Sequence, residues 1–307
     1  MEYDGIRQID YSTGFKEPIV LCLGFFDCVH RGHNALVQRA RLFAKIECAK
    51  CAVFTFTDNP LSRLDKGDKE IFTYEERLFR LWQLGADVVV KAQPDEKFFA
   101  TKADEFLDNL FERFNIVAVT AGTDYTYGAG AAGNADTLKE YCRKHGADCY
   151  IVDMIEYAQG KKIASREIRE MVKNGEIERV NALMPLPYIV AGKIVKGRHD
   201  GAAIGTPTAN VDIPDEKLPV ASGVYDTNVL IDGVRLRAVT NVGEHPTFGD
   251  SHYNVESYIL HWKDNIYGKF IVVEFLKRLR DVKKFDTKEE LSAQIAKDVA
   301  EVLGRKS

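Results

Sequence analysis

The sequence predicts an α/β domain followed by a small antiparallel β-barrel that carries a C-terminal helix. Its 307 residues exceed the roughly 250 at which single hydrophobic cores stop growing, so two domains are expected. Short apolar runs alternate with helical patterns up to Met184, whereas strands and tight turns follow Pro187. Because Pro185 and Pro187 end the preceding helix, we place the boundary between domains 1–184 and 185–307.

In the first domain, each continuous apolar run is followed by a helical pattern, which is typical of a parallel sheet covered on both faces. Strands are expected at residues 19–23, 52–56, 88–90, 116–120 and 149–153. Helices are expected at 33–46, 74–84, 102–113, 135–145, 165–173 and 177–183. Helix 74–84 has an amphipathic pattern, with charged side chains predicted to point outward. Ligands of such sheets bind beyond the carboxyl ends of the strands.

The second domain changes to strand patterns. Asp232-Gly233 joins expected strands 225–231 and 234–240, because this dipeptide supplies the positive φ angles of a tight hairpin turn. Further strands are expected at 253–260 and 270–275. The last helix, 288–302, carries Leu291, Ile295, Val299 and Val302 on one face and is expected to plug or flank the barrel.

Charge and composition exclude several classes of function. The 42 basic and 46 acidic residues give a net charge of −4, which lacks the basic face of a duplex-binding protein. The sequence has no apolar run of about 18 residues, and residues 1–15 show no signal-peptide pattern. All six cysteines lie in the first half, and no disulfide framework is needed. We therefore expect a cytoplasmic protein with no nucleic-acid or membrane partner, and the oligomeric state stays open.

A phosphate-binding loop is predicted where the first strand ends. Residues 19–23 run into GFFDCVHRGH (24–33), where a helix begins. Gly24 permits a sharp turn, Gly32 lets the backbone approach a ligand closely, and the helix N-terminus offers free N–H groups to an anion. His30 and His33 flank Gly32 and can add donors to phosphate oxygens as charge builds in a transition state.

These residues resemble the nucleotidylyltransferases, in particular the adenylyltransferase half of bacterial bifunctional riboflavin kinase/FAD synthetases, whose pattern is G-x-F-D-G-V-H-x-G-H. Three later segments resemble family segments in the same order: VFTF (53–56) with Pro60, GTDYTYG (122–128) with Gly133, and IASREIR (163–169). The resemblance implies a Rossmann-like nucleotidylyltransferase fold for this half.

The resemblance also implies a reaction in which an FMN phosphate oxygen attacks the α-phosphorus of ATP and pyrophosphate leaves. His30 and His33 would bind and polarise phosphates, while Arg169 would stabilise the departing pyrophosphate. The implied nucleotide and phosphate contacts are Gly24, Phe26, Asp27, Gly32 and Ser165, and the implied flavin contacts in this half are Asp124 and Tyr127.

Three residues depart from the family pattern: Cys28, Asn59 and Arg166 stand where Gly, His and Thr are common. They leave open an alternative, a riboflavin kinase whose adenylyltransferase half is degenerate, weak or inactive.

Two other motifs in the first half point to different functions and have to be weighed against the resemblance. Gly128 to Gly133 spells G-x-G-x-x-G, the fingerprint of a dinucleotide-binding dehydrogenase, but the apolar run before it already stops at Thr120. A flexible nucleotide-contacting loop is therefore favoured. Cys48 and Cys51 form a lone C-x-x-C that lacks the further ligands of a zinc site and is favoured as a structural turn.

A second phosphate site is predicted in the barrel domain. Residues 192–210 are Gly-rich and basic and end in PTAN, and they contain no Walker loop. Main-chain N–H groups of such a loop can wrap phosphates. The Thr208 hydroxyl and the Asn210 carbonyl oxygen are hard ligands that suit Mg²⁺.

This half resembles the riboflavin kinase family, whose pattern runs G-x-P-T-A-N, G-V-Y, N-x-G-x-x-P-T-F and then a Glu on the next strand. The matching segments are 205–210, 223–225, 241–248 and 255–257. The resemblance implies that Thr208 and Asn210 hold Mg²⁺ and that Glu256 is the general base for the ribityl 5′-hydroxyl. It further implies phosphate contacts at Gly197 and Gly205 and a flavin contact at Arg280. We expect Glu256 to point inward from its strand, where the other interpretation is a buried salt bridge.

The sequence thus predicts a bifunctional enzyme that phosphorylates riboflavin with ATP and Mg²⁺ and then adenylates the FMN with a second ATP. Besides the kinase with a degenerate first half, two alternatives stay open: a flavin or nucleotide sensor without turnover, and a dehydrogenase.

Overall fold

The computed structural model describes residues 6–60, 69–153, 155–158, 160–195, 208–247, 250–262 and 266–304. The chain divides into two compact units, Glu2–Ser165 and Arg166–Ser307. Helices α6 (Ser165–Lys173) and α7 (Ile177–Leu183) were expected in the first domain. In the structure α7 packs against the strands of the barrel that contain Tyr188 and Phe275. Asn181 explains this packing, because its side-chain amide donates to the Phe275 carbonyl at 2.8 Å and accepts from the Tyr188 N–H at 2.8 Å.

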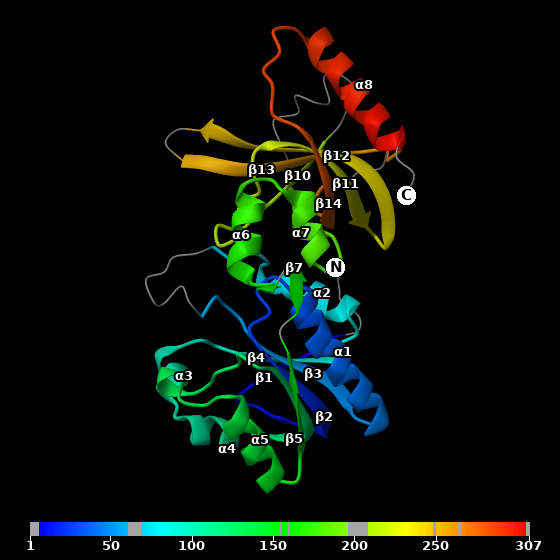
Figure 1. Ribbon diagram of the computed structural model, residues 1–307. Coiled ribbons are helices and arrows are strands. Elements are labelled where there is room, and N and C mark those ends of the chain that lie inside the picture. The colour runs from blue at the N-terminus through cyan, green and yellow to red at the C-terminus, as the bar shows by residue number, and fades with distance from the viewer. Residues whose placement is uncertain are drawn as a thin grey trace. The chain divides into compact units, whose positions relative to one another are not determined.

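The first unit is built on one six-stranded, all-parallel sheet, as predicted (Figure 1). The strand order is β1-β4-β3-β2-β5-β6. The strands are β1 (Arg7–Asp10), β2 (Phe15–Leu23), β3 (Lys50–Phe56), β4 (Val88–Ala92), β5 (Phe114–Gly122) and β6 (Asp148–Val152). β1 was not predicted, because this edge strand is short and largely polar.

Helices cover both faces of this sheet. The helices are α1 (Arg31–Ile46), α2 (Tyr74–Gln83), α3 (Glu96–Ala100), α4 (Ala103–Arg113) and α5 (Ala135–Lys144). Ile19, Leu21 and Leu23 of β2 join the core cluster that includes the apolar residues of α4 and α5. Successive side chains of a strand point to opposite faces, so Val20 and Cys22 face the other layer, which contains α1. A short antiparallel pair follows, β7 (Glu156–Ala158) and β8 (Lys161–Lys162).

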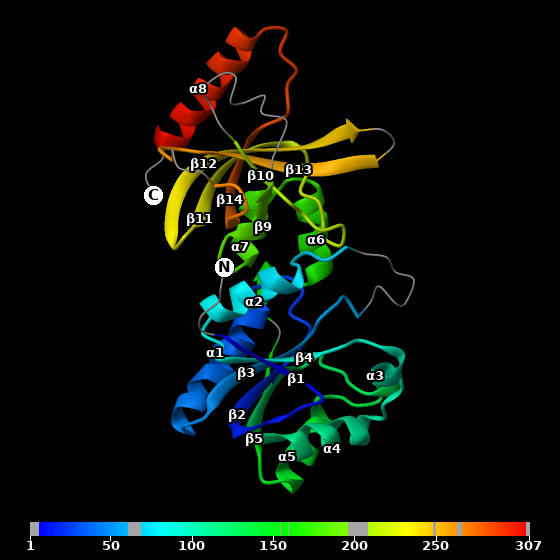
Figure 2. The ribbon, with the colours of Figure 1, turned by 180° about the vertical axis from the view of Figure 1, so that it is seen from behind.

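The second unit contains a closed antiparallel barrel in the order β10-β13-β12-β11-β14-β9, which confirms the second half of the predicted fold. Its strands are β9 (Tyr188–Val195), β10 (Ala209–Val211), β11 (Gly223–Ile231), β12 (Val234–Thr247), β13 (Asp250–Ile259) and β14 (Phe270–Arg280). The predicted hairpin turn is present, with φ of 49° at Asp232 and 79° at Gly233. Helix α8 (Lys288–Gly304) runs outside the barrel (Figure 2), where Val302 packs against Val224 and Val239.

Candidate active sites

The predicted phosphate loop lies at the carboxyl end of β2 and leads into α1. Its backbone bends through positive φ angles at Phe26 (60°) and Val29 (46°), which are uncommon for residues other than glycine. Close packing accounts for both glycines that were singled out. A Cβ at Gly24 would lie 2.9 Å from the Phe26 ring, and a Cβ at Gly32 would lie 2.9 Å from the His30 ring. The backbone of this loop therefore packs so closely on the Phe26 and His30 rings that only glycine fits at positions 24 and 32.

His30 is the N-cap of α1, and its Nδ1 accepts the His33 backbone N–H at 3.2 Å. The His30 and His33 rings stack with centroids 3.8 Å apart and planes 6° apart. An Nδ1 that accepts a hydrogen bond leaves the proton of a neutral imidazole on Nε2. His30 is thus oriented as an Nε2–H donor at the N-terminus of α1.

Both imidazoles are held neutral by burial. His30 is 8% exposed, and loss of solvent lowers its pKa to about 4, against smaller raising effects of a backbone hydrogen bond and Asp124. Burial also lowers the pKa of His33 well below its usual value, and the neighbouring His30 adds to this effect. The His33 Nδ1 is enclosed and has no hydrogen-bond partner among the described residues. A ligand that brings an acceptor or donor to this atom would satisfy it.

We expect the His30 imidazole to stay neutral, with its proton on Nε2, down to about pH 5, whereas an exposed histidine titrates near pH 6.5. A ¹⁵N NMR titration of the imidazoles, with the His30 signals assigned from a His30→Asn variant, checks this. The unfolded chain binds this proton below about pH 6.5 and the folded chain only near pH 4, so folding loses stability as the pH falls through that window. A His30 midpoint near 6.5 would contradict the burial argument.

Cys28, His30 and His33 bring one ligand atom each to within 4.8 Å of one another. This cluster is not a ready metal centre, because the lone pairs of two stacked rings lie in parallel planes and do not converge on one ion. In addition, the only lone pair of His30 already accepts the His33 N–H. The Cys28 sulfur instead lies 3.4 Å from the Ser165 hydroxyl. Cys28 therefore contacts the other end of the predicted phosphate site.

Two predicted nucleotide contacts have structural partners of their own. Asp27 is 4% exposed, and its Oδ1 accepts the Ile71 N–H at 3.1 Å while its carbonyl accepts the Phe72 N–H at 3.1 Å. Phe26 is fully buried, with its ring 4.9 Å from that of His33. Both residues thus support the loop around the histidines, and direct contacts with a nucleotide stay a prediction.

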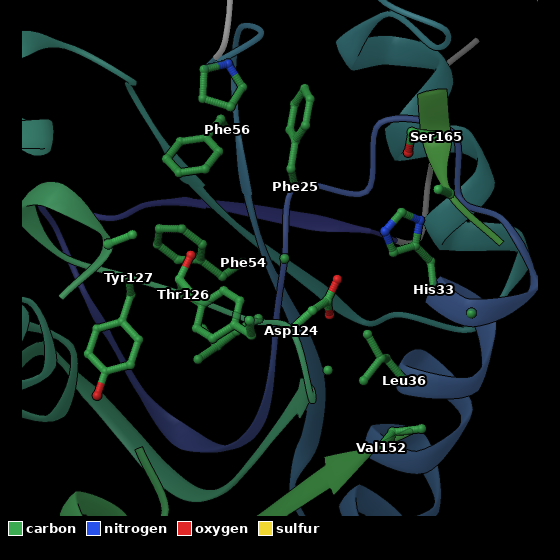
Figure 3. A pocket seen from close by; sticks show the side chains of 18 of the residues that line it. Phe25, His33, Leu36, Phe54, Phe56, Asp124, Thr126, Tyr127, Val152 and Ser165 are labelled. Atoms are coloured by element: carbon green, nitrogen blue, oxygen red, sulfur yellow. The ribbon is translucent and has the colours of Figure 1, made fainter. Parts of the chain in front are cut away.

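A cavity of about 820 Å³ opens beside the histidines. Its aromatic side is formed by Phe25, Phe54, Phe56, Phe98, Phe106, Tyr125 and Tyr127. Figure 3 shows Phe25, Phe54, Phe56 and Tyr127 on one side and His33 and Ser165 on the other, with Asp124 between them. The predicted residues Gly24, His30, Gly32, Asp124, Tyr127 and Ser165 all line this cavity. An apolar, ring-lined end beside a polar end suits a ligand that joins an aromatic ring to a phosphate.

The G-x-G-x-x-G segment is a closed loop on the rim of this cavity. β5 ends at Gly122, so Gly128 does not follow a strand as the dehydrogenase fingerprint requires. Tyr127 and Gly133 pair through two backbone hydrogen bonds, and the Tyr127 hydroxyl lies 2.9 Å from that of Thr137. A Cβ at Gly133 would meet the Tyr127 ring at 2.4 Å. The segment positions Tyr127 and does not form a dinucleotide site of the dehydrogenase type.

In the barrel, Asn210 and Glu256 are directly opposite each other on β10 and β13. Asn210 is 7% exposed, and its Oδ1 accepts from the Asn254 amide at 3.2 Å. Thr208 directly precedes β10 and is two residues from Asn210. Gly197 and Gly205 lie outside the described residues. The structure thus brings together Asn210 and Glu256, whereas a place for Thr208 in the same site stays a prediction.

The expectation that Glu256 points into the barrel is wrong. On β13, Val255, Ser257 and Ile259 are buried, whereas Glu256 is half-buried. The Ser257 hydroxyl bonds that of Thr240 at 2.8 Å in the interior, so Glu256 lies on the outer face. Tyr258, two residues on, packs beside Val302 of α8 on that same face. No ion pair links Glu256 to another residue that the structure describes.

Arg280 forms a bidentate pair with Asp298 of α8, with Nε to Oδ1 at 3.0 Å and an Nη to Oδ2 at 2.7 Å. A guanidinium held in this way anchors α8 to the end of β14. A flavin contact by Arg280 stays a prediction. Arg169 is 7% exposed on α6 in the second compact unit, and its role at the departing pyrophosphate stays a prediction as well.

Comparison with known proteins decides the family. The family model described as FAD synthetase matches residues 13–167, and the one described as riboflavin kinase matches residues 184–304. A bifunctional riboflavin kinase/FMN adenylyltransferase of Bacillus subtilis is 32% identical, with 92% of this chain and 91% of that protein covered. The chain belongs to this bifunctional family. An Escherichia coli member is 31% identical over 96% of this chain and 94% of its own.

A solved structure titled as a macrolide-efflux protein from Streptococcus pneumoniae has the same fold as this chain. Its TM-score is 0.85 at 28% identity, with 97% of this chain and 99% of that chain covered. In the part of the chain that the structure describes, we find no helix with the length and apolar character needed to cross a membrane.

The prediction that helix 74–84 turns its charges outward is wrong. Glu76 and Arg77 of α2 are fully buried and Arg80 is 2% exposed, whereas the apolar Trp82 is 42% exposed. Glu76 closes a capping box with Thr73, which explains its burial at the helix start. The T-x-x-E spacing at Thr73 to Glu76 could have identified the cap. No sequence signal marked Arg77.

Proposed function

We propose that this protein phosphorylates riboflavin with ATP in its barrel and adenylates the resulting FMN with a second ATP in its α/β unit, releasing pyrophosphate. The observation that carries the proposal is that one chain matches both family models in succession. The FAD synthetase match spans the whole phosphate loop and cavity, and nothing in the comparisons favours a degenerate first half.

In the adenylyl transfer, we assign His30 and His33 to the phosphates of ATP and FMN. The His30 Nε2–H donates to a phosphate oxygen and gains strength as that oxygen accumulates negative charge. Free N–H groups at the start of α1 add to this field. Since both imidazoles are neutral at pH 7, they act as donors and need no proton uptake beforehand. Ser165 and Arg169 are assigned to the departing pyrophosphate.

In the barrel, we assign Thr208 and Asn210 to Mg²⁺ and Glu256 to the riboflavin 5′-hydroxyl. The residues fit a hard cation: the Asn254 amide fixes the Asn210 Oδ1 as the acceptor, and that oxygen keeps a second lone pair. Bound there, Mg²⁺ would neutralise charge on the transferred phosphate. Glu256 accepts the hydroxyl proton as the oxygen attacks phosphorus. Gly197, Gly205 and Arg280 are assigned to phosphate and flavin by family resemblance.

We further assign the two reactions to domains 1–184 and 185–307 and place the protein in the cytoplasm. Purified protein incubated with riboflavin, ATP and Mg²⁺, with products resolved by chromatography over time, tests the function. FMN is expected to appear first and FAD after it, together with pyrophosphate. FMN without FAD would refute the adenylyl transfer, and the absence of both products would leave a binding protein without turnover.

Asn210→Ala is expected to raise the Mg²⁺ concentration needed for half-maximal FMN formation by about 10-fold or more, because it removes one oxygen ligand. A Mg²⁺ titration of FMN formation at saturating ATP measures this. Asn254→Ala removes only the group that orients the Asn210 amide, so it should raise the Mg²⁺ requirement by a smaller factor than Asn210→Ala does. An unchanged Mg²⁺ requirement in folded Asn210→Ala would contradict the metal assignment.

A further inference from the structure

The buried Arg77 is the largest charged group that the mechanism above does not use. Its side chain is 0% exposed on α2. Burying a guanidinium is costly unless oxygen atoms surround it. Desolvation lowers the pKa of Arg77, and Glu70 and Asp27 oppose that effect. A sequence that only needed to fill this space would do so at less cost with an apolar side chain.

The guanidinium of Arg77 holds two separate segments of the chain. From the end of β3 it contacts the Thr55 hydroxyl at 3.1 Å, the Phe56 carbonyl at 2.9 Å and the Thr57 carbonyl at 3.5 Å. From the phosphate loop it contacts the Phe25 carbonyl at 3.4 Å, and Thr55 donates to that same carbonyl at 2.7 Å. The carboxyl ends of β2 and β3 are thus fixed to one planar group.

Two further contacts complete this anchor. Glu70 pairs with an Arg77 Nη at 3.5 Å, which neutralises the buried charge. The guanidinium also lies 4.8 Å from the centre of the Phe25 ring, within the range of a cation–π interaction. Arg77 therefore fixes both the backbone and the ring of Phe25.

Phe25 and Phe56, the residues whose carbonyls Arg77 binds, both line the cavity, with ring centroids 6.3 Å apart. Figure 3 shows them on the aromatic side, across from His33. We propose that Arg77 is a positioning residue of the adenylyl-transfer site, which holds Phe25 and Phe56 as a fixed wall for the planar ring of FMN. This inference rests on the proposed function of the α/β unit.

The proposal predicts a defect in FMN affinity. Arg77→Met is expected to raise the KM for FMN in FAD formation by about 10-fold, because a loosened wall no longer presents its rings to the flavin. The kcat at saturating FMN and the KM for ATP should change far less. Arg77→Lys keeps the charge but loses the planar fork, so its KM for FMN should lie between those of wild type and Arg77→Met.

The experiment measures the initial rate of FAD formation against FMN and ATP concentration, and FMN binding by quenching of flavin fluorescence. Arg80→Met is the matched control, since it removes another buried guanidinium from α2, one that donates to Gln83 of the same helix. If Arg77→Met does not fold, Arg77→Lys and the double variant Glu70→Gln/Arg77→Met, which removes the charge of the Glu70 carboxylate together with that of Arg77, take its place.

An unchanged KM for FMN in any folded Arg77 variant would overturn the proposal. An equal rise in Arg80→Met would also overturn it, because the effect would then belong to α2 as a whole. If wild-type protein makes no FAD, the proposed function fails, yet fluorescence quenching still tests whether Arg77 governs FMN binding. FMN formation from riboflavin in the same samples should stay at the wild-type rate.

Discussion

Replacing His30 by Asn is expected to lower the rate of FMN conversion to FAD by about 10² to 10³, the usual cost of removing one preorganised donor from a transition state. The reason lies in the orientation of the ring: its Nδ1 accepts the His33 N–H, so only Nε2–H can reach a ligand. FMN formation from riboflavin should be unchanged, since Glu256, Asn210 and Thr208 belong to the barrel.

The choice of substitution separates catalysis from helix stability. Asn is a preferred N-cap and keeps an acceptor for the start of α1, whereas Ala loses the cap as well, at about 1 kcal/mol. His30→Asn and His30→Ala should therefore be equally inactive in FAD formation, while only His30→Ala loses thermal stability. His145→Gln, at an exposed histidine of the same unit, is the control. FAD formation that survives in His30→Asn would remove His30 from the mechanism.

The order and class of the elements could be predicted where apolar runs are long. β2, β3 and β5 each contain an uninterrupted buried run, residues 19–23, 51–55 and 118–121, and these runs are where the sequence pattern is clear. β9 and β10 were both missed, and β10 pairs over only three residues, directly after a Gly-rich stretch. Sequence patterns detect burial that repeats over several residues, and a strand of three residues is too short to show such a pattern.

The candidate sites were predicted in their residue types and only partly in their geometry. Spacing placed His30 and His33 beside one helix start, yet the stacking of their rings depends on Gly32, which leaves room for His30. Glu256 was placed on the correct strand and on the wrong face, since a period of two fixes alternation but not which side is interior. Arg77 was missed because a helical pattern ranks charged residues as exposed, and here carbonyl oxygens from two distant segments make burial possible.

Replacing Glu256 by Gln is expected to lower FMN formation by about 10² to 10⁴, the range of general acid–base contributions, and to leave FMN conversion to FAD intact. Gln keeps the size and the hydrogen bonding of the side chain and removes its capacity to take a proton. Glu256 is half-buried on the outer face of the barrel, opposite Asn210. In this position its carboxylate is accessible to the hydroxyl group of a substrate.

The matched control is Glu216→Gln, an exposed carboxylate of the same unit, which should keep both activities. The measurement is a time course of FMN from riboflavin and of FAD from added FMN on the same preparation. Since no described residue pairs with Glu256, its loss leaves no buried cation unpaired, and the folded fraction should stay that of wild type. Loss of both activities in a folded Glu256→Gln protein would contradict two separate sites, whereas full FMN formation would assign the proton to another acceptor.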